Sequence, residues 1–171
     1  MHVEKTNLEN VLKITLEVFE DHRGYYIETY NEDVYKKNSI AVNFIQDDIS
    51  VSKKNILRGI HGDQETWKLI SCLEGEFYLV VVNNDENSVQ YRKWQSFTLS
   101  EHNPIQILVP PKFGNGHLVL SERAIFHYKQ NTYYNPEGQF TILWNDPEYN
   151  IKWPTADPIL SKRDEAGHFV D

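Results

Sequence analysis

The stretch KLISCLEGEFYLVVV, residues 68–82, is the part of the sequence that decides the fold. It contains two apolar runs, residues 68–73 and 77–82, and the second is rich in β-branched and aromatic side chains, which favour strands. Glu74-Gly75-Glu76 separates the runs, and a glycine in such a place is typical of a tight hairpin. The stretch therefore predicts two buried strands that pair with each other.

Further short apolar runs lie on both sides of this stretch. In several of these runs apolar residues alternate with polar ones, as they do in a strand whose sheet has one face in the core. Strands are predicted for residues 12–19, 25–30, 44–51, 91–99, 105–109, 117–120, 124–129 and 140–144. Short helices are predicted for residues 31–38 and 161–167, the second with Ser161 as its N-cap. We therefore expect an all-β protein, a single domain over residues 1–171, folded as a sandwich or barrel with a few short helices.

The composition limits the classes of function. Of the 171 residues, 40% are hydrophobic and 25% are charged, as is usual for a soluble globular protein. The net charge of −8 argues against a nucleic-acid groove and against an anionic membrane surface. Met1 is not followed by an apolar signal region, and no run is long enough to span a bilayer, so we expect a cytoplasmic protein. Cys72, the only cysteine, lies in an apolar run and is interpreted as a buried structural thiol.

The segment Arg58-Gly59-Ile60-His61 combines residue types that proton transfer needs. A glycine near a histidine lets the backbone approach a ligand closely. Arg58 can bind an anion, and histidine is the side chain best matched to proton transfer near neutral pH. An exposed histidine in a loop would leave the same local pattern, so both interpretations stay open at this point.

Tyr128 is a second candidate for proton transfer. It lies in a predicted strand whose alternation places Phe126 and Tyr128 on one face, with His127 and Lys129 on the other. A tyrosine on the core face of a barrel can pack there with its hydroxyl bonded, or it can point into a pocket and donate a proton. The alternation does not decide between these roles.

A polar segment near the N-terminus contains Asp21, Arg23 and Glu28 around a glycine. Aspartate at the start of such a segment is typical of a solvated turn. Arg23 and Arg58 can instead bind a pyrophosphate together through charge-assisted hydrogen bonds. Both interpretations remain at this stage.

A set of short motifs runs from residue 18 to residue 166. The motifs are Phe19-x-Asp21-x-Arg23-Gly24-x-Tyr26-x-Glu28, Gln46-x-Asp48-x-Ser50-x-Ser52, Leu57-Arg58-Gly59-Ile60-His61, Lys68-Leu69, Gly75, Pro110-x-x-Phe113, Tyr128-Lys129, Thr132-x-Tyr134, Trp144-Asn145-Asp146-Pro147, Ile151-x-Trp153-Pro154 and Leu160-Ser161-x-x-Asp164. In their order and spacing they resemble the dTDP-4-keto-6-deoxy-hexose 3,5-epimerase family, the RmlC-like cupins. The resemblance implies a cupin jelly-roll β-barrel, usually a homodimer, that uses no metal and no organic cofactor.

The resemblance also implies a role for each matching residue. His61 corresponds to the catalytic base, Asp164 to the carboxylate that orients it, and Tyr128 to the acid on the opposite face of the sugar. Lys68 corresponds to a lysine beside the ketone oxygen. The implied substrate-binding residues are Arg23, Arg58, Glu28, Gln46, Asp48, Asn115 and His117.

The implied substrate is a nucleotide-linked 4-keto sugar. Its ketone acidifies the hydrogens on carbons C3 and C5, because loss of either leaves an enolate. His61 would remove such a proton, Lys68 would stabilise the oxyanion, and Tyr128 would return a proton from the other face, which inverts the carbon.

Some positions depart from the family pattern. Gly62-Asp63 stands where the family usually has an aromatic residue and a glutamine. Asn115-Gly116-His117 replaces the usual His-Gly-Phe, so Asn115 takes the place of a second pocket histidine and His117 that of an aromatic residue. With these changes the sequence looks similar to the branch that acts on GDP-linked 4-keto-heptoses for bacterial capsules, which we take as the expected substrate.

Three other functions fit the same fold. A metal-dependent cupin would use His117, but its first motif would offer only His61 and Glu65, and a mononuclear site needs several ligands. A sugar-nucleotide 3,4-ketoisomerase would use similar proton transfer. A non-enzymatic carbohydrate-binding cupin would keep the barrel and need no pair of acid and base.

Overall fold

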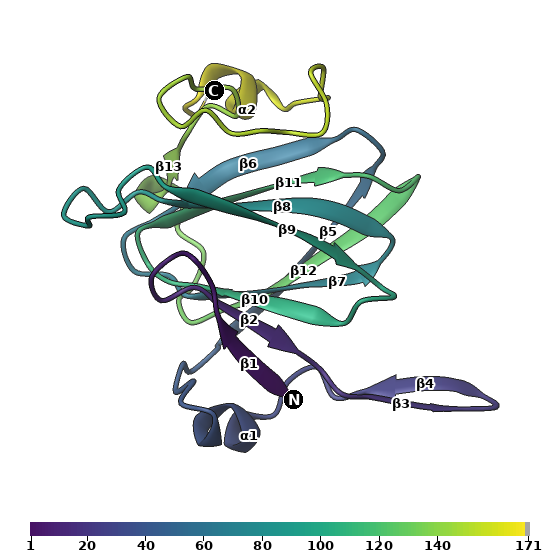
Figure 1. Cartoon of the computed structure of the whole chain (residues 1–171). Helices are drawn as coiled ribbons and strands as arrows, with labels where there is room; N and C mark the ends of the chain where they lie inside the picture. Colours follow the sequence, from purple (N-terminus) through teal and green to yellow (C-terminus); the bar gives the residue numbers. More distant parts are fainter. Residues whose placement is uncertain (170–171) are drawn as a thin grey trace.

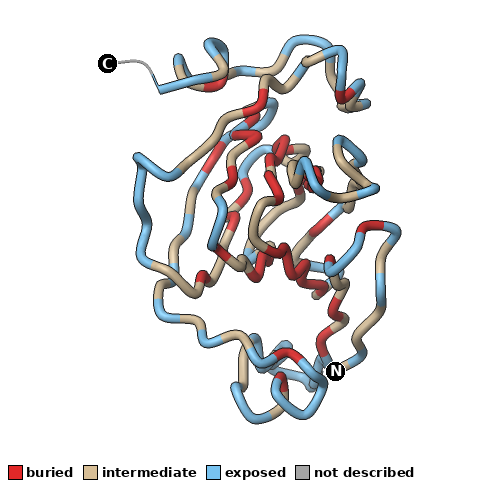
Figure 2. The backbone as a smooth tube through the Cα atoms, turned by 90° about the vertical axis from the view of Figure 1, so that its left-hand side faces the viewer, coloured by how far each residue is buried: buried red, intermediate tan, exposed pale blue. Residues whose placement is uncertain are grey.

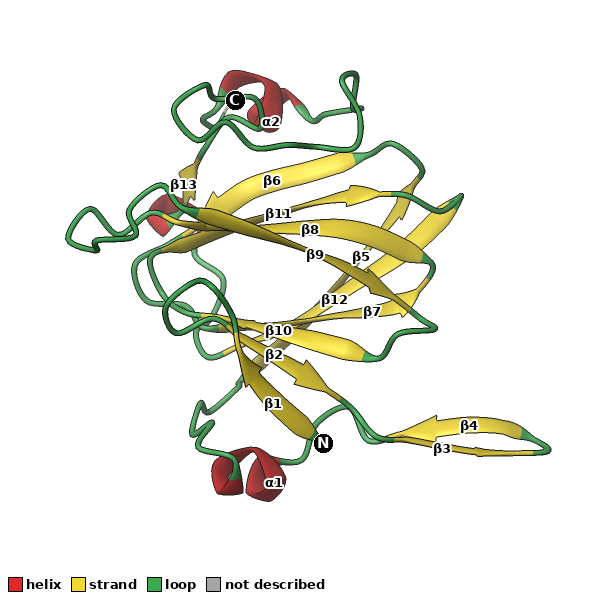
Figure 3. Ribbon diagram, in the orientation of Figure 1, coloured by secondary structure: helices red, strands yellow, loops and turns green. Residues whose placement is uncertain are grey.

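The computed structural model describes residues 1–169, which fold as two antiparallel sheets that face each other (Figures 1 and 3). The first sheet contains, in spatial order, β1 (His2–Lys5), β2 (Leu12–Thr15), β10 (Ile105–Val109), β7 (Lys68–Glu74), β12 (Arg123–Gln130) and β5 (Gln46–Lys53). The second contains β13 (Phe140–Thr141), β6 (Leu57–Gly62), β11 (Phe113–Val119), β8 (Glu76–Asn83) and β9 (Trp94–Ser100). The prediction of an all-β jelly roll is confirmed.

The main core lies between the two sheets. Phe77, Leu79 and Val81 of β8 are fully buried and belong to one cluster with Ile70 of β7 and Ile107 of β10. Figure 2 shows the buried residues mainly in the middle of the molecule, while the outer segments are mostly exposed or intermediate. Burial of each such side chain stabilises the fold by roughly 1.5–3 kcal/mol.

The turn at residues 74–76 joins the two sheets and does not form a hairpin. β7 pairs with β10 and β12, whereas β8 pairs with β9 and β11. Gly75 adopts a φ of 74°, and a Cβ atom there would lie 2.0 Å from the carbonyl oxygen of Arg123. The predicted pairing of these strands is therefore wrong, because a corner between sheets and a hairpin share the same local pattern of two apolar runs around a glycine.

The N-terminal part contains a separate two-stranded hairpin. β3 (Val18–Asp21) and β4 (Gly24–Ile27) pair only with each other and project away from the two large sheets (Figure 1). The strand predicted for residues 12–19 is thus broken after Thr15, and the one predicted for residues 25–30 ends at Ile27.

The two predicted helices are confirmed. They are α1 (Glu32–Lys37) and α2 (Lys162–Ala166), and a short 3₁₀ helix, η1 (Pro136–Gly138), accompanies them. Ser161 is the N-cap of α2, as predicted, because its side chain accepts a hydrogen bond from the backbone of Asp164. No helix within residues 1–169 is long and apolar enough to cross a membrane.

Strand β6 and the first half of β11 were not predicted from apolar alternation, because glycines interrupt it. A Cβ atom on Gly59 would lie 2.6 Å from the Cα of Gly116, so the two strands approach each other as only glycine allows. Their pairing places His61 opposite Asn115. The glycines that interrupt the apolar pattern of these two strands therefore also bring two candidate site residues, His61 and Asn115, opposite each other.

Candidate active site

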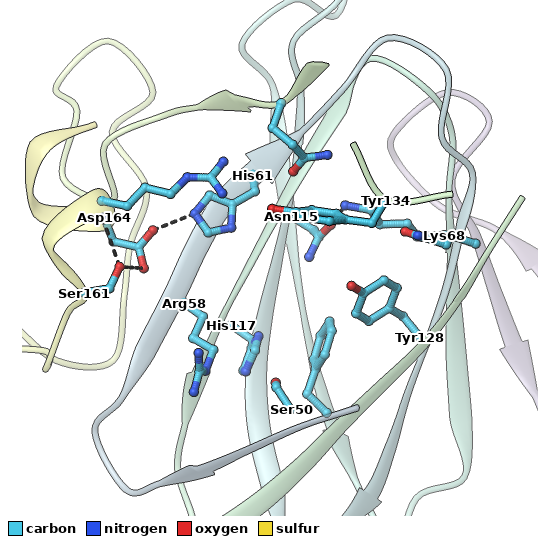
Figure 4. A pocket seen from close by; sticks show the side chains of 14 residues that line it. Ser50, Arg58, His61, Lys68, Asn115, His117, Tyr128, Tyr134, Ser161 and Asp164 are labelled. Carbon is cyan, nitrogen blue, oxygen red and sulfur yellow. Dashed lines mark hydrogen bonds and ion pairs between the residues drawn. The ribbon is translucent and has the colours of Figure 1, made fainter. Parts of the chain in front are cut away.

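A cavity of about 300 Å³ lies between the two sheets (Figure 4). Both sheets and the C-terminal segment contribute side chains to it, and its volume is at the lower end of the range for small-molecule sites. The lining residues are Ser50, Arg58, His61, Lys68, Asn115, His117, Phe126, Tyr128, Gln130, Tyr134, Gln139, Ser161, Arg163 and Asp164.

His61 of β6 and Asp164 of α2 form a pair at one wall of the cavity (Figure 4). The His61 Nε2 atom lies 2.6 Å from Asp164 Oδ1, and the Asp164 side chain is 3% exposed. Ser161 donates a hydrogen bond of 2.8 Å to the second carboxylate oxygen. The carboxylate thus fixes the imidazole with Nε2–H as the donor, which leaves Nδ1 as the basic nitrogen.

Hydrogen bonding governs the charge of Asp164. Burial raises the pKa of this carboxyl, but hydrogen bonds from His61 and Ser161 outweigh burial and lower the pKa below its ordinary value. Asp164 is therefore ionised at neutral pH and can stabilise a proton on His61.

This shift predicts a pH dependence of stability. The folded carboxyl has a lower pKa than the value of about 3.9 for an unfolded aspartate, so its contribution to stability is present above that pH and is lost as the pH falls through the folded pKa. We expect the free energy of unfolding in urea to fall more steeply for the wild type than for Asp164→Asn between about pH 5 and about pH 3. Equal slopes for the two proteins would contradict this coupling.

Lys68 of β7 places a cation in the cavity. Its Nζ atom lies 3.5 Å from Asn115 Oδ1 and 5.8 Å from the centre of the Tyr128 ring. Burial lowers the pKa of Lys68. Among the residues that the structure describes, no carboxylate lies within ion-pair distance of its ammonium group, so this cation is available to an oxyanion.

Tyr128 of β12 points into the cavity (Figure 4). Burial, and after it the neighbouring Asp48 carboxylate, raise the pKa of Tyr128 to about 12. The hydroxyl therefore keeps its proton at neutral pH and can donate it. The alternation predicted for this strand is confirmed, because His127 and Lys129 bind Asp47 on the other face of the sheet.

Seven of the predicted site residues line the cavity together. They are His61, Tyr128, Asp164, Lys68, Arg58, Asn115 and His117. Gln46 and Asp48 do not line it: they lie on β5 beside Tyr128, where Gln46 donates a hydrogen bond of 2.8 Å to Asp48.

Arg23 and Glu28 are not part of the cavity in the single chain. Arg23 lies in the turn between β3 and β4, which projects from the sheets, and its side chain is 79% exposed and paired with Asp21. Glu28 follows β4 and accepts a hydrogen bond from Asn31. The projecting hairpin therefore separates these two predicted binding residues from the others.

Several lining residues were not predicted as site residues, although four of them had a local signal: Phe126 shares the predicted face of Tyr128, and Ser161 is the predicted N-cap beside Asp164. Gln130 follows Phe126 and Tyr128 in the same alternation, and Ser50 follows Gln46 and Asp48 in theirs. The other missed residues are Tyr134, Gln139 and Arg163. Tyr134 and Gln139 lie in the connection between β12 and β13, whose path no local pattern gives.

Two observations concern other kinds of chemistry, namely a metal site and a nucleophilic cysteine. Within residues 1–169, no three side chains of His, Cys, Asp or Glu are grouped as a metal site requires. Cys72 lies outside the cavity, and burial raises the pKa of its thiol to about 12, which disfavours the nucleophilic thiolate.

Comparison with known proteins gives one consistent result. The family model for dTDP-4-dehydrorhamnose 3,5-epimerase matches residues 5–171. The chain is 41% identical over 170 residues to the dTDP-4-dehydrorhamnose 3,5-epimerase of Escherichia coli (strain K12), covering 96% of this chain and 92% of the relative.

Solved structures agree with this match. The dTDP-6-deoxy-D-glucose-3,5-epimerase of Legionella pneumophila, in complex with dTDP-4-keto-L-rhamnose, has a TM-score of 0.93 and 34% identity, over 98% of this chain and 91% of that one. The dTDP-4-dehydrorhamnose 3,5-epimerase of Bacillus anthracis, with TDP and PPi bound, has a TM-score of 0.94 and 32% identity, over 99% of both chains.

Proposed function

The chain belongs to the dTDP-4-dehydrorhamnose 3,5-epimerase family and is an isomerase of the epimerase class, and from this premise we propose that it inverts carbon C3, carbon C5 or both in a nucleotide-linked 4-keto sugar. The observation that carries the proposal is the His61–Asp164 pair in one cavity with Tyr128 and Lys68. These groups suffice for proton removal, oxyanion stabilisation and proton return.

Proton removal would fall to His61. The Asp164 carboxylate accepts from Nε2–H, so Nδ1 is free to take a proton from a carbon beside the ketone. The ionised carboxylate would then stabilise the imidazolium that forms. A well-placed base of this kind contributes on the order of 10² to 10⁴ in rate.

The enolate would be stabilised by Lys68. Its ammonium group lies close to Tyr128 and Asn115, so a sugar ring beside Tyr128 can direct its C4 oxygen to this cation. Removal of one such donor typically costs roughly 3 kcal/mol of transition-state stabilisation. Tyr128 would complete the reaction, because its raised pKa keeps the proton that it must deliver.

The relatives favour a dTDP-linked substrate. The Legionella structure contains dTDP-4-keto-L-rhamnose and the Bacillus structure contains TDP. A dTDP-linked 4-keto-6-deoxy-hexose is therefore the first candidate. These relatives do not support the GDP-linked 4-keto-heptose expected from the sequence, which stays a second candidate. Asn115 and His117 favour it, because they replace the family's usual histidine and aromatic residue at the cavity wall.

Product analysis tests this function. The wild type is incubated with a dTDP-linked 4-keto-6-deoxy-hexose and, separately, with a GDP-linked 4-keto-heptose, and the configuration at C3 and C5 is determined by NMR. Inversion of one substrate supports the reaction and identifies the nucleotide and sugar. Inversion of neither would overturn the proposed function.

A homodimer is also part of this proposal. The β3–β4 hairpin exposes Phe19, Tyr25 and Tyr26 by 55%, 59% and 65%, which is a large apolar surface for a projecting hairpin. If a second copy covers this surface, Arg23 and Glu28 can serve the partner's cavity. We expect a mass in solution of twice that of one chain, measured by sedimentation equilibrium, and a monomeric mass would contradict the dimer.

A further inference from the structure

The Lys68 ammonium group has few partners in the protein. Within residues 1–169, its one hydrogen-bond acceptor is the side-chain oxygen Oδ1 of Asn115, at 3.5 Å, and no carboxylate lies within ion-pair distance. A cation that is withdrawn from water depends on the acceptors that remain around it. A change at Asn115 should therefore alter both the position and the charge of this ammonium group.

The contact between Lys68 and Asn115 joins the two sheets across the cavity. Lys68 belongs to β7 of the first sheet and Asn115 to β11 of the second. Asn115 is also the cross-strand neighbour of His61, and it lies between His61 and Lys68 (Figure 4). The ammonium group lies 5.8 Å from the centre of the Tyr128 ring as well. Because a lysine side chain is long and flexible, the contact with Asn115 selects the rotamers that keep its cation near both His61 and Tyr128.

The side chain of Asn115 is an acceptor that carries no charge. An ammonium group only donates hydrogen bonds, so the amide turns its oxygen toward Lys68 and its NH₂ group away. A carboxylate at this position would form an ion pair with Lys68 and weaken the attraction of the cation for an oxyanion. The histidine that the family usually has at this position would become a second cation at low pH and repel Lys68.

Other charges act on Lys68 without contacting it. Burial lowers the pKa of Lys68 most, and after it the negative charge of Asp63 raises the pKa and the positive charge of Arg163 lowers it. The charged or titratable groups that line the cavity with Lys68 are Arg58, His61, His117, Tyr128, Tyr134, Arg163 and Asp164. The pKa of Tyr128 is raised to about 12, so Lys68 loses its proton before Tyr128 as the pH rises. The alkaline limit of activity should therefore report the charge of Lys68.

We infer that Asn115 is a positioning residue for Lys68: it keeps the ammonium group in its charged form and directed at the C4 oxygen of the sugar, without neutralising the charge. The inference rests on the proposed function, in which Lys68 stabilises the enolate. It adds a role for Asn115 to the substrate binding that the family resemblance implies.

Two substitutions of Asn115 with opposite expected effects test this inference. Asn115→Leu keeps the size and branching of the side chain and removes the acceptor. We expect the kcat of this variant to fall by about 10- to 100-fold with KM within about threefold, because the ammonium group loses its position. The alkaline limb of its pH profile should move to lower pH by about one pH unit, because the charged form of Lys68 loses its acceptor.

Asn115→Asp should move the alkaline limb in the other direction, because a carboxylate favours the charged form of Lys68. Its kcat should fall as well, since the ion pair weakens the attraction for the oxyanion. Lys68→Gln identifies the limb, which should disappear when the ammonium group is absent. A residue that only supports the fold would lower the rate at every pH and leave the limb in place.

NMR of ¹³C-labelled lysine follows the same charge in the protein without a sugar, with the Lys68 signal identified by its loss in Lys68→Gln. We expect its titration midpoint to be lower in Asn115→Leu and higher in Asn115→Asp than in the wild type. Equal midpoints in all three proteins, or a change in KM alone, would overturn the inference. Because the NMR titration needs no substrate, that result differs from failure of the proposed function, which would appear as a wild type that inverts neither candidate sugar.

Discussion

Replacement of His61 by asparagine is expected to slow solvent deuterium exchange into the sugar by about 10³- to 10⁴-fold. The amide keeps a hydrogen-bonding group near Asp164, which lies 2.6 Å from the histidine, but it has no basic nitrogen to accept a carbon-bound proton. Exchange is measured by mass spectrometry of the sugar in D₂O, and circular dichroism verifies that the variant is folded.

His127 offers a matched control for this variant. Its Nε2 atom also lies 2.6 Å from an aspartate, Asp47, but on the outer face of the first sheet. His127→Asn removes a histidine from an equally close His–Asp pair outside the cavity, so we expect exchange within about twofold of the wild type. A loss of exchange in His127→Asn as large as in His61→Asn would contradict the assignment of the base.

Replacement of Tyr128 by phenylalanine is expected to separate exchange from inversion. The variant lacks the hydroxyl that we propose as the acid opposite to His61, so we expect the rate of inverted product to fall by about 10³-fold. His61 can still remove a proton and return a deuteron on its own side. The variant should therefore exchange deuterium with retained configuration, which NMR of the recovered sugar detects.

Tyr78 serves as the control tyrosine, because its hydroxyl donates to the carbonyl oxygen of Lys152 and its side chain does not line the cavity. Tyr78→Phe should invert the sugar at close to the wild-type rate. Inversion by Tyr128→Phe at the wild-type rate would show that another group donates the proton.

Alternation and capping made part of the site predictable. Phe126 and Tyr128 share the cavity face because side chains in a strand point alternately to opposite faces of the sheet. This alternation does not depend on which strands lie beside it. Ser161 caps α2 because its hydroxyl satisfies a free backbone N–H group, and the same cap brings Asp164 to His61. Both signals are local, so the sequence alone contains them.

Pairing between distant strands could not be predicted in the same way. The turn at Gly75 joins two sheets because β7 and β8 find partners far away in the sequence, and no local pattern reports those partners. The contact between Lys68 and Asn115 is likewise a property of the packed structure, since it joins the two sheets across the cavity. The placement of Arg23 outside the cavity depends on the path of the β3–β4 hairpin.

The central claim is that this cavity exchanges protons at the carbons beside a sugar ketone. The most direct measurement is incubation of the wild type in D₂O with each candidate nucleotide-linked 4-keto sugar, followed by mass spectrometry and NMR of C3 and C5. We predict deuterium at C3, C5 or both in one of the sugars, with inverted configuration at the labelled carbon. No deuterium at either carbon of either sugar, or a product whose ketone has moved from C4 to C3, would contradict the claim.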